Sequence, residues 1–191
     1  EEAKKILEED GWKVGSKGIR EKGGRPLELN FYLNSNNAQE KTIAESIQND
    51  LRKVGIKVNV IGEEKQAFLD RQKTGKFDLQ YSLSWGAPYD PQSYLSSWRI
   101  PAHGDYQAQI GLKDKALIDE EITKLMTEPD AAKRQELLTD ILTRIHNSAV
   151  YLPVSYSKTK AIHSKALHDV EFASSQYEIP FEKMTFAAPQ K

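Results

Sequence analysis

The chain has 191 residues, with 27 basic and 28 acidic side chains, a formal net charge of −1 and no cysteine. This length suits one domain with a sizeable core, and the balanced charge argues against binding nucleic acid or an anionic membrane through the whole surface. The balanced charge fits a small ligand or a protein partner better. The lack of cysteine excludes a disulfide framework, a thiolate metal site and a Cys nucleophile.

The opening residues predict a helix from Glu1 to Asp10 that ends at Gly11. Neither a Met nor a signal-peptide pattern stands at the amino terminus. We therefore expect the chain to be a fragment of a longer protein. No apolar run approaches the roughly 20 residues of a membrane span.

A strand, a helix and a second strand are predicted next. After a Gly- and charge-rich connection over residues 15–26, apolar and polar residues alternate over 27–33, which favours a strand. Residues 38–54 carry apolar positions at helical spacing, and Gly55 ends that helix before the β-branched strand 56–61. Strand, helix and strand in this order are typical of a βαβ crossover.

The same plan recurs with a helix over residues 63–73, a turn at Gly75 and a strand over 77–83, so the predicted class is α/β with a mixed sheet flanked by helices. The acidic pair Glu63 and Glu64 is expected on the solvated surface of the first helical turn. Further helices are predicted over 115–127 and 131–150. Closing strands are expected over 151–156 and 160–163, and a loose tail over 187–191.

The segment from Ser84 to Pro91 begins where a predicted strand ends, the place where open α/β sheets bind ligands. Trp85 and Tyr89 offer large flat surfaces in a rigid loop rich in Gly and Pro. From the residues alone, Trp85 is either a core side chain or part of a ligand site. Asp90 is predicted to cap a short helix with Pro91 at its first position, and Trp98 on that helix is predicted to pack rather than bind.

His103 lies in a stretch without hydrophobic periodicity, between Pro101 and Gly104, which indicates an exposed or lid-like loop over residues 100–106. Its imidazole is either a metal ligand or a solvated side chain. The sequence holds no HExxH motif, no Gly-x-Ser-x-Gly elbow, no phosphate-binding glycine loop and no His/Asp/Glu cluster. An enzyme, such as a metal-dependent hydrolase, therefore has no specific support, and we expect no catalytic residue and no covalent cofactor.

Three stretches together resemble the family 5 extracellular solute-binding proteins of ABC importers, and most of all their nickel-binding members. These stretches are Ile61 to Glu64, the box from Trp85 to Pro91 followed by Leu95 to Ser97, and Asp140 to His146 followed by Ala149 to Pro153. The resemblance implies that residues 1–191 form the carboxy-terminal lobe of a two-lobed periplasmic-binding-protein-like fold of type II, cluster C. It also implies a periplasmic protein that delivers its ligand to a membrane permease.

The resemblance implies a role for three residues. Trp85 and Tyr89 match the aromatic wall of a nickel-chelate pocket, and His103 matches the loop histidine that ligates the metal directly. The organic chelate would supply most of the metal's ligands, and His103 would take an open position. The arginine that meets the chelate's carboxylates belongs to the missing amino-terminal lobe.

A peptide-binding protein of the same family is the nearest alternative. Such members usually carry a carboxylate shortly after the Trp of the box, which receives the amino terminus of the peptide. Residues 86–89 contain no carboxylate, and Asp90 is expected to serve as a helix cap. The sequence therefore favours a nickel chelate over a peptide.

Overall fold

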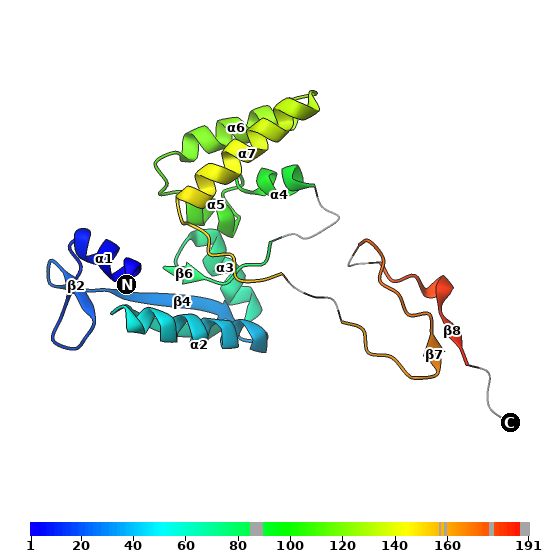
Figure 1. Cartoon of the computed structure of the whole chain (residues 1–191), viewed down its shortest axis with the longest axis horizontal. Coiled ribbons are helices and arrows are strands. Elements are labelled where there is room, and N and C mark those ends of the chain that lie inside the picture. The colour runs from blue at the N-terminus through cyan, green and yellow to red at the C-terminus, as the bar shows by residue number, and fades with distance from the viewer. Residues whose placement is uncertain (85–89, 157, 159, 176–177, 188–191) are drawn as a thin grey trace. The chain divides into compact units, whose positions relative to one another are not determined.

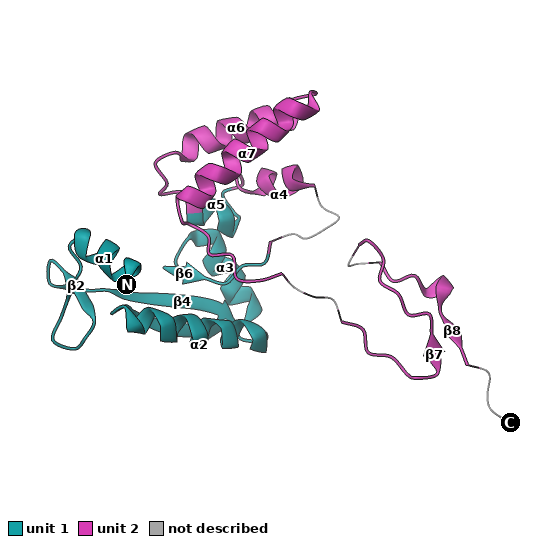
Figure 2. Ribbon diagram, viewed as in Figure 1, with its two compact units in different colours: residues 1–83, 101–108 teal, residues 84–100, 109–191 magenta. Residues whose placement is uncertain are grey.

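The computed structural model describes residues 1–84, 90–156, 158, 160–175 and 178–187. Contacts between residues divide the chain into two compact units (Figure 2). Unit 1 comprises Glu1–Leu83 and Pro101–Ala108, and unit 2 comprises Ser84–Ile100 and Gln109–Lys191. Each unit has its own hydrophobic core.

The central sheet of unit 1 has three parallel strands in the order β5-β4-β6. Strands β4 and β6 of this sheet are labelled in Figure 1. Its strands are β4 (Glu28–Asn34), β5 (Lys57–Glu63) and β6 (Leu79–Gln80). Helix α2 (Ala38–Lys53) connects β4 to β5, and helix α3 (Lys65–Thr74) connects β5 to β6. The predicted βαβ crossover and its repetition are therefore confirmed.

The two helices use different faces of this sheet. Phe31 and Leu33 of β4 are buried with Ala44 of α2 in the core of unit 1. The intervening Tyr32 points to the opposite face because successive side chains of a strand alternate. On that face Arg71 of α3 stacks on the Tyr32 ring. Helices on both faces are what a parallel sheet requires.

Local signals set the ends of α2. The Asn37 side chain accepts hydrogen bonds from the backbone N–H groups of Gln39 and Glu40, which satisfies donors that the first helical turn leaves free. The Glu40 carboxylate in turn accepts from the backbone N–H of Asn34, at the end of β4. Gly55, at φ +86°, reverses the chain toward β5, as its position in the sequence predicts.

The amino-terminal part of unit 1 contains α1 (Glu2–Glu9) and a small antiparallel sheet of β1 (Lys13–Val14), β2 (Arg20–Lys22) and β3 (Arg25–Pro26). The helix is confirmed, and Gly11 follows it at φ +89°. The small sheet lies in the stretch predicted as a connection. Its strands have two or three residues, too few to show an alternation in the sequence.

The described part of unit 2 contains the helices α4 (Pro91–Ser97), α6 (Lys115–Thr127) and α7 (Ala131–Asn147). Leu95, Trp98, Ile122 and Ile141 lie in its core. Trp98, 2% exposed, meets Tyr94 edge to face and stacks on Tyr151, so its predicted packing role is confirmed. The bounds of α6 match the prediction, and α7 ends three residues earlier than predicted.

The predicted closing strands over residues 151–156 and 160–163 are wrong, because these residues are not in strands. Tyr156 and Ile162 are almost fully exposed. The β-branched and aromatic residues of these two segments favour a strand only where a neighbouring strand and a packed face are available. Further along the described chain, the two-residue strands β7 (Leu167–His168) and β8 (Thr185–Phe186) pair antiparallel, and the 3-10 turn η1 (Phe181–Lys183) precedes β8.

The structure confirms an α/β protein with helices around a sheet, and it contains both parallel and antiparallel strand pairs. Among the described residues, no helix is both long enough and apolar enough to cross a membrane. Of the expected tail, residues 188–191 lie outside the described part of the chain.

Candidate functional site

The carboxyl ends of β4, β5 and β6 lie at one edge of the sheet because the three strands are parallel. Strand β6 ends at Gln80, but the backbone N–H of Tyr81 still bonds to the carbonyl oxygen of Tyr32. The chain then continues through Ser84 toward the box. The predicted strand of residues 77–83 is thus shorter than expected, but the box does follow a strand of the parallel sheet.

Two of the three predicted site residues, Trp85 and Tyr89, lie outside the described residues, as do residues 86–88 between them. The aromatic wall therefore stays a prediction. Asp90 is described, and its Oδ1 accepts a hydrogen bond from the backbone N–H of Gln92 at 2.7 Å. Pro91 holds the first helical position, so the predicted cap of α4 is confirmed.

The third predicted site residue, His103, is half-buried and immediately precedes helix α5 (Gly104–Gln109). Its carbonyl oxygen accepts a hydrogen bond from the backbone N–H of Gln107. The loop predicted over residues 100–106 is therefore wrong from Gly104 onward. A helix of six residues that begins with glycine shows too little apolar periodicity for sequence analysis to find it.

His103 belongs to unit 1, and the next residue, Gly104, lies against α3 and β6 of that unit. A Cβ atom on Gly104 would come within 2.8 Å of Gln80 Nε2 and within 3.4 Å of the Gln72 Cβ. A Cβ atom on Gly75 would likewise come within 2.6 Å of Gln107 Oε1. Two glycines therefore let residues 101–108 lie directly against α3 and β6.

Gln80 and Gln72 were not singled out by sequence analysis. The available signal was Gly104 itself, because a glycine beside a candidate ligand often marks a close approach of the backbone to another element. Gln80 Oε1 is buried and accepts no hydrogen bond from any residue in the described ranges.

A charged cluster lies at the same edge of the sheet. Arg71 of α3 binds both carboxylate oxygens of Glu63, the last residue of β5, and its guanidinium lies 3.9 Å from the Tyr32 ring centroid. Its third nitrogen donates to the carbonyl oxygen of Lys76. The Arg71 guanidinium hydrogen bonds hold the pKa of Glu63 below its ordinary value. Because each of the three guanidinium nitrogens of Arg71 already donates a hydrogen bond within the chain, we assign the pair a structural role in positioning α3.

The prediction that Glu63 and Glu64 both lie in the first turn of a helix is therefore wrong for Glu63. Glu63 ends a strand and is ion-paired, whereas Glu64 caps α3 by accepting from the backbone N–H of Gln66. The sequence could not separate the two because adjacent glutamates look alike until a partner is placed.

Within the described ranges, no group of three or more His, Asp or Glu side chains lies close enough to hold a metal ion. At most two such side chains of the described residues could thus bind one metal ion together, and its remaining ligands would have to come from elsewhere.

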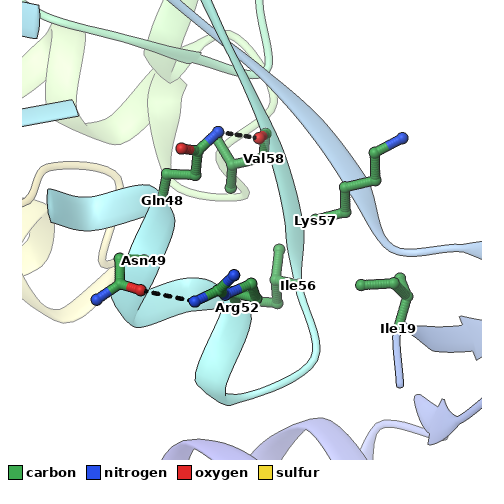
Figure 3. A pocket seen from close by; sticks show the side chains of 7 residues that line it. All are labelled: Ile19, Gln48, Asn49, Arg52, Ile56, Lys57 and Val58. Carbon is green, nitrogen blue, oxygen red and sulfur yellow. Dashed lines mark hydrogen bonds between the residues drawn. The ribbon is translucent and has the colours of Figure 1, made fainter. Parts of the chain in front are cut away.

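A cavity of about 350 Å³ lies at the opposite edge of the sheet, where β5 begins (Figure 3). Figure 3 shows two hydrogen bonds along its wall, from Gln48 Nε2 to the Val58 carbonyl oxygen and from Arg52 to Asn49. This is not the edge at which parallel sheets bind ligands, and His103 is not among its lining residues. The carboxyl edge of the sheet is therefore the better candidate.

Residues 1–106 match the family of bacterial extracellular solute-binding proteins, family 5 Middle. Over 190 residues, or 99% of the chain, the sequence is 44% identical to the nickel-binding periplasmic protein of Escherichia coli strain K12, of which it spans 36%. It is 30% identical over 144 residues, 71% of the chain, to the oligopeptide-binding protein OppA of Lactococcus lactis subsp. cremoris strain SK11, of which it spans 22%.

Among solved structures, NikA from Brucella suis in complex with Fe(III)-EDTA superposes with a TM-score of 0.91 at 45% identity, over 97% of this chain and 37% of that one. The chain thus spans little more than a third of the nickel-binding relative and of NikA. Together with the parallel sheet and its flanking helices, these matches show that the chain belongs to the family 5 bacterial extracellular solute-binding proteins.

Proposed function

We propose that this chain is one lobe of a periplasmic solute-binding protein that captures a nickel ion as an organic chelate and delivers it to the permease of an ABC importer. The single observation that carries the proposal is the 44% identity to a nickel-binding periplasmic protein across nearly the whole chain. The relative that superposes at a TM-score of 0.91 was solved with a metal chelate, Fe(III)-EDTA.

The proposal gives each predicted residue a physical task. Trp85 and Tyr89 would cover the flat face of the chelate, since aromatic rings combine a large apolar surface with one polar group. His103 would donate a ring nitrogen to a coordination position that the chelator leaves open. The remaining ligands would come from the chelator, and the opposing wall of the cleft from the amino-terminal lobe.

Calorimetry of the full two-lobed protein tests this proposal with two Ni(II) complexes. Nitrilotriacetate leaves coordination positions of Ni(II) open, whereas EDTA fills them. We expect saturable binding of both complexes, and we expect His103→Ala to weaken binding of the nitrilotriacetate complex more than that of the EDTA complex. The isolated chain is expected to bind either complex weakly, because closure of two lobes buries the ligand.

Peptide binding is the second candidate, and the identity to OppA supports it. The same titration with a mixture of short peptides separates the two candidates. Saturable peptide binding without binding of either nickel complex would refute the nickel proposal.

A further inference from the structure

Gln80 presents a polar atom whose role the fold alone does not explain. Its side-chain oxygen, Oε1, is buried without a hydrogen-bond donor from the described residues. Buried acceptors are almost always paired in folded proteins, because burying one unpaired loses its hydrogen bonds to water. An acceptor left open at the edge of a candidate site is a place where a donor is expected when the site is occupied.

The segment that carries His103 lies beside the Gln80 side chain. The Gln80 amide lies close enough to Gly104 that a Cβ there would come within 2.8 Å of Nε2. His103 is the adjacent residue, half-buried, and belongs to the same compact unit as Gln80. No hydrogen bond joins the His103 imidazole to Gln80 within the described part of the chain.

We propose that Gln80 is a positioning residue for His103: its Oε1 accepts the N–H of one imidazole nitrogen while the other nitrogen binds the metal of the chelate. This inference rests on the proposed function. A neutral imidazole has one N–H and one lone pair, so a metal that takes the lone pair leaves the N–H in need of an acceptor. An acceptor there selects the tautomer and fixes the plane of the ring.

The carbonyl oxygen of a glutamine suits this task because it accepts without adding charge. Gln72 also borders Gly104, but through its Cβ and Cδ atoms, and its side-chain oxygen is not among the buried unpaired atoms of the described residues. Gln72 is therefore a matched control for the removal of a glutamine beside the same glycine.

The test uses the full two-lobed protein and three variants, Gln80→Leu, Gln80→Glu and Gln72→Leu. Gln80→Leu removes the acceptor and is expected to weaken binding of the Ni(II)–nitrilotriacetate complex about tenfold, a typical effect of losing a partner that orients a metal-bound histidine. It should leave the EDTA complex unaffected. Gln80→Glu keeps an acceptor but adds a charge, and it is expected to bind the nitrilotriacetate complex more tightly than Gln80→Leu does. Gln72→Leu is expected to bind like the native protein.

A spectroscopic measurement separates positioning from a general structural effect. In the Ni(II)–nitrilotriacetate complex, the N–H proton of a nickel-bound imidazole has a strongly shifted proton resonance that exchanges with water. We expect this resonance in the native protein and its loss in His103→Ala. In Gln80→Leu this proton should exchange with water faster than in the native protein, because no hydrogen bond protects the N–H group. Circular dichroism checks that each variant is folded.

The inference would be overturned if Gln80→Leu bound the nitrilotriacetate complex as tightly as the native protein, if it weakened both complexes equally, or if Gln72→Leu had the same effect. If His103→Ala left both affinities unchanged, the inference would fall while the nickel proposal survived. If the native protein bound neither complex, both would fall.

Discussion

Arg20 donates a hydrogen bond from Nε to the carbonyl oxygen of Val54, 2.8 Å away and 34 residues further along the chain. The same guanidinium donates to the Trp12 carbonyl oxygen and to the Glu8 carboxylate, and its side chain is only 2% exposed. One side chain therefore joins α1, the small antiparallel sheet and the turn between α2 and β5.

Replacing this side chain should destabilise unit 1. Arg20→Met keeps the apolar stem but leaves the carbonyl oxygens of Val54 and Trp12 without their donor, for an expected loss of about 3 kcal/mol in the free energy of unfolding. Urea unfolding followed by tryptophan fluorescence measures the loss. The exposed Arg25, changed to Met in the same way, is the control and should cost less than about 0.5 kcal/mol. Equal losses for the two variants would contradict the central role of Arg20.

Gly55 and Gly18 form a pair that separates backbone strain from a steric clash. Both have positive φ, +86° and +76°, but a Cβ on Gly55 would come within 2.8 Å of Arg20 Cγ and 3.2 Å of a backbone oxygen, whereas a Cβ on Gly18 would meet nothing within 4 Å. We expect Gly18→Ala to cost about 1 kcal/mol and Gly55→Ala about 2–3 kcal/mol of unfolding free energy. Thermal denaturation of the two variants compares them, and the prediction fails if Gly18→Ala is the more harmful.

The ion pair of Glu63 and Arg71 predicts a pH dependence of stability. The pKa of Glu63 is lowered from 4.5 by hydrogen bonds from Arg71, so the folded chain holds the proton less tightly than the unfolded chain. The resulting stability is fully present above about pH 4.5 and is lost as pH falls through the lower, folded value. Glu63→Gln should remove this part of the acid dependence in urea unfolding between pH 3 and 6. Arg71→Met should remove the same part, and an unchanged slope in Arg71→Met would show that another group is responsible.

Two aspartates that cap helices of unit 2 should each contribute measurably. Asp90 Oδ1 accepts from the backbone N–H of Gln92, and Asp130 Oδ1 accepts from that of Lys133 at 2.9 Å. Asp90→Ala and Asp130→Ala are each expected to reduce the unfolding free energy by about 1 kcal/mol. The corresponding Asn variants keep an accepting oxygen, and their unfolding free energy should fall by only about 0.3 kcal/mol. Alanine variants as stable as the native chain would rule out this role.

Adjacent residues of α7 test how the apolar face is used. Ile141 is fully buried in the core of unit 2, whereas Leu142 is 46% exposed. Ile141→Ala should cost about 2–5 kcal/mol because it leaves a cavity, and Leu142→Ala about 1 kcal/mol or less. Chemical denaturation of both variants decides whether burial, rather than apolar character alone, sets the loss of unfolding free energy.

The sequence predicted the helices and the crossover well, because their signals are local. Apolar residues at helical spacing located α2 and α6, and the cap at Asp90 was correctly assigned from residue type and position. The candidate site was predicted only in part. Of its three predicted residues, only His103 lies in the described part of the chain. The roles of Trp85 and Tyr89 rest on the resemblance of their motif to the family.

Features that depend on partners distant in sequence were missed or wrong. Residues 151–156 have the composition of a strand, yet no strand pairs with them, because β-propensity is decided by neighbours rather than by the segment itself. The burial of Arg20 and the ion pair of Glu63 depend on groups 8 to 34 residues away, so neither shows in a local pattern.

By itself, then, the sequence determined the α/β class, the main helices with their caps, and the stretch that follows β6. Periodicity, capping and turn residues act over a few neighbours and can be read along the chain. Only the tertiary structure placed the His103 segment against α3 and β6 and left Gln80 with a buried, unpaired oxygen, because packing joins residues that the sequence keeps far apart.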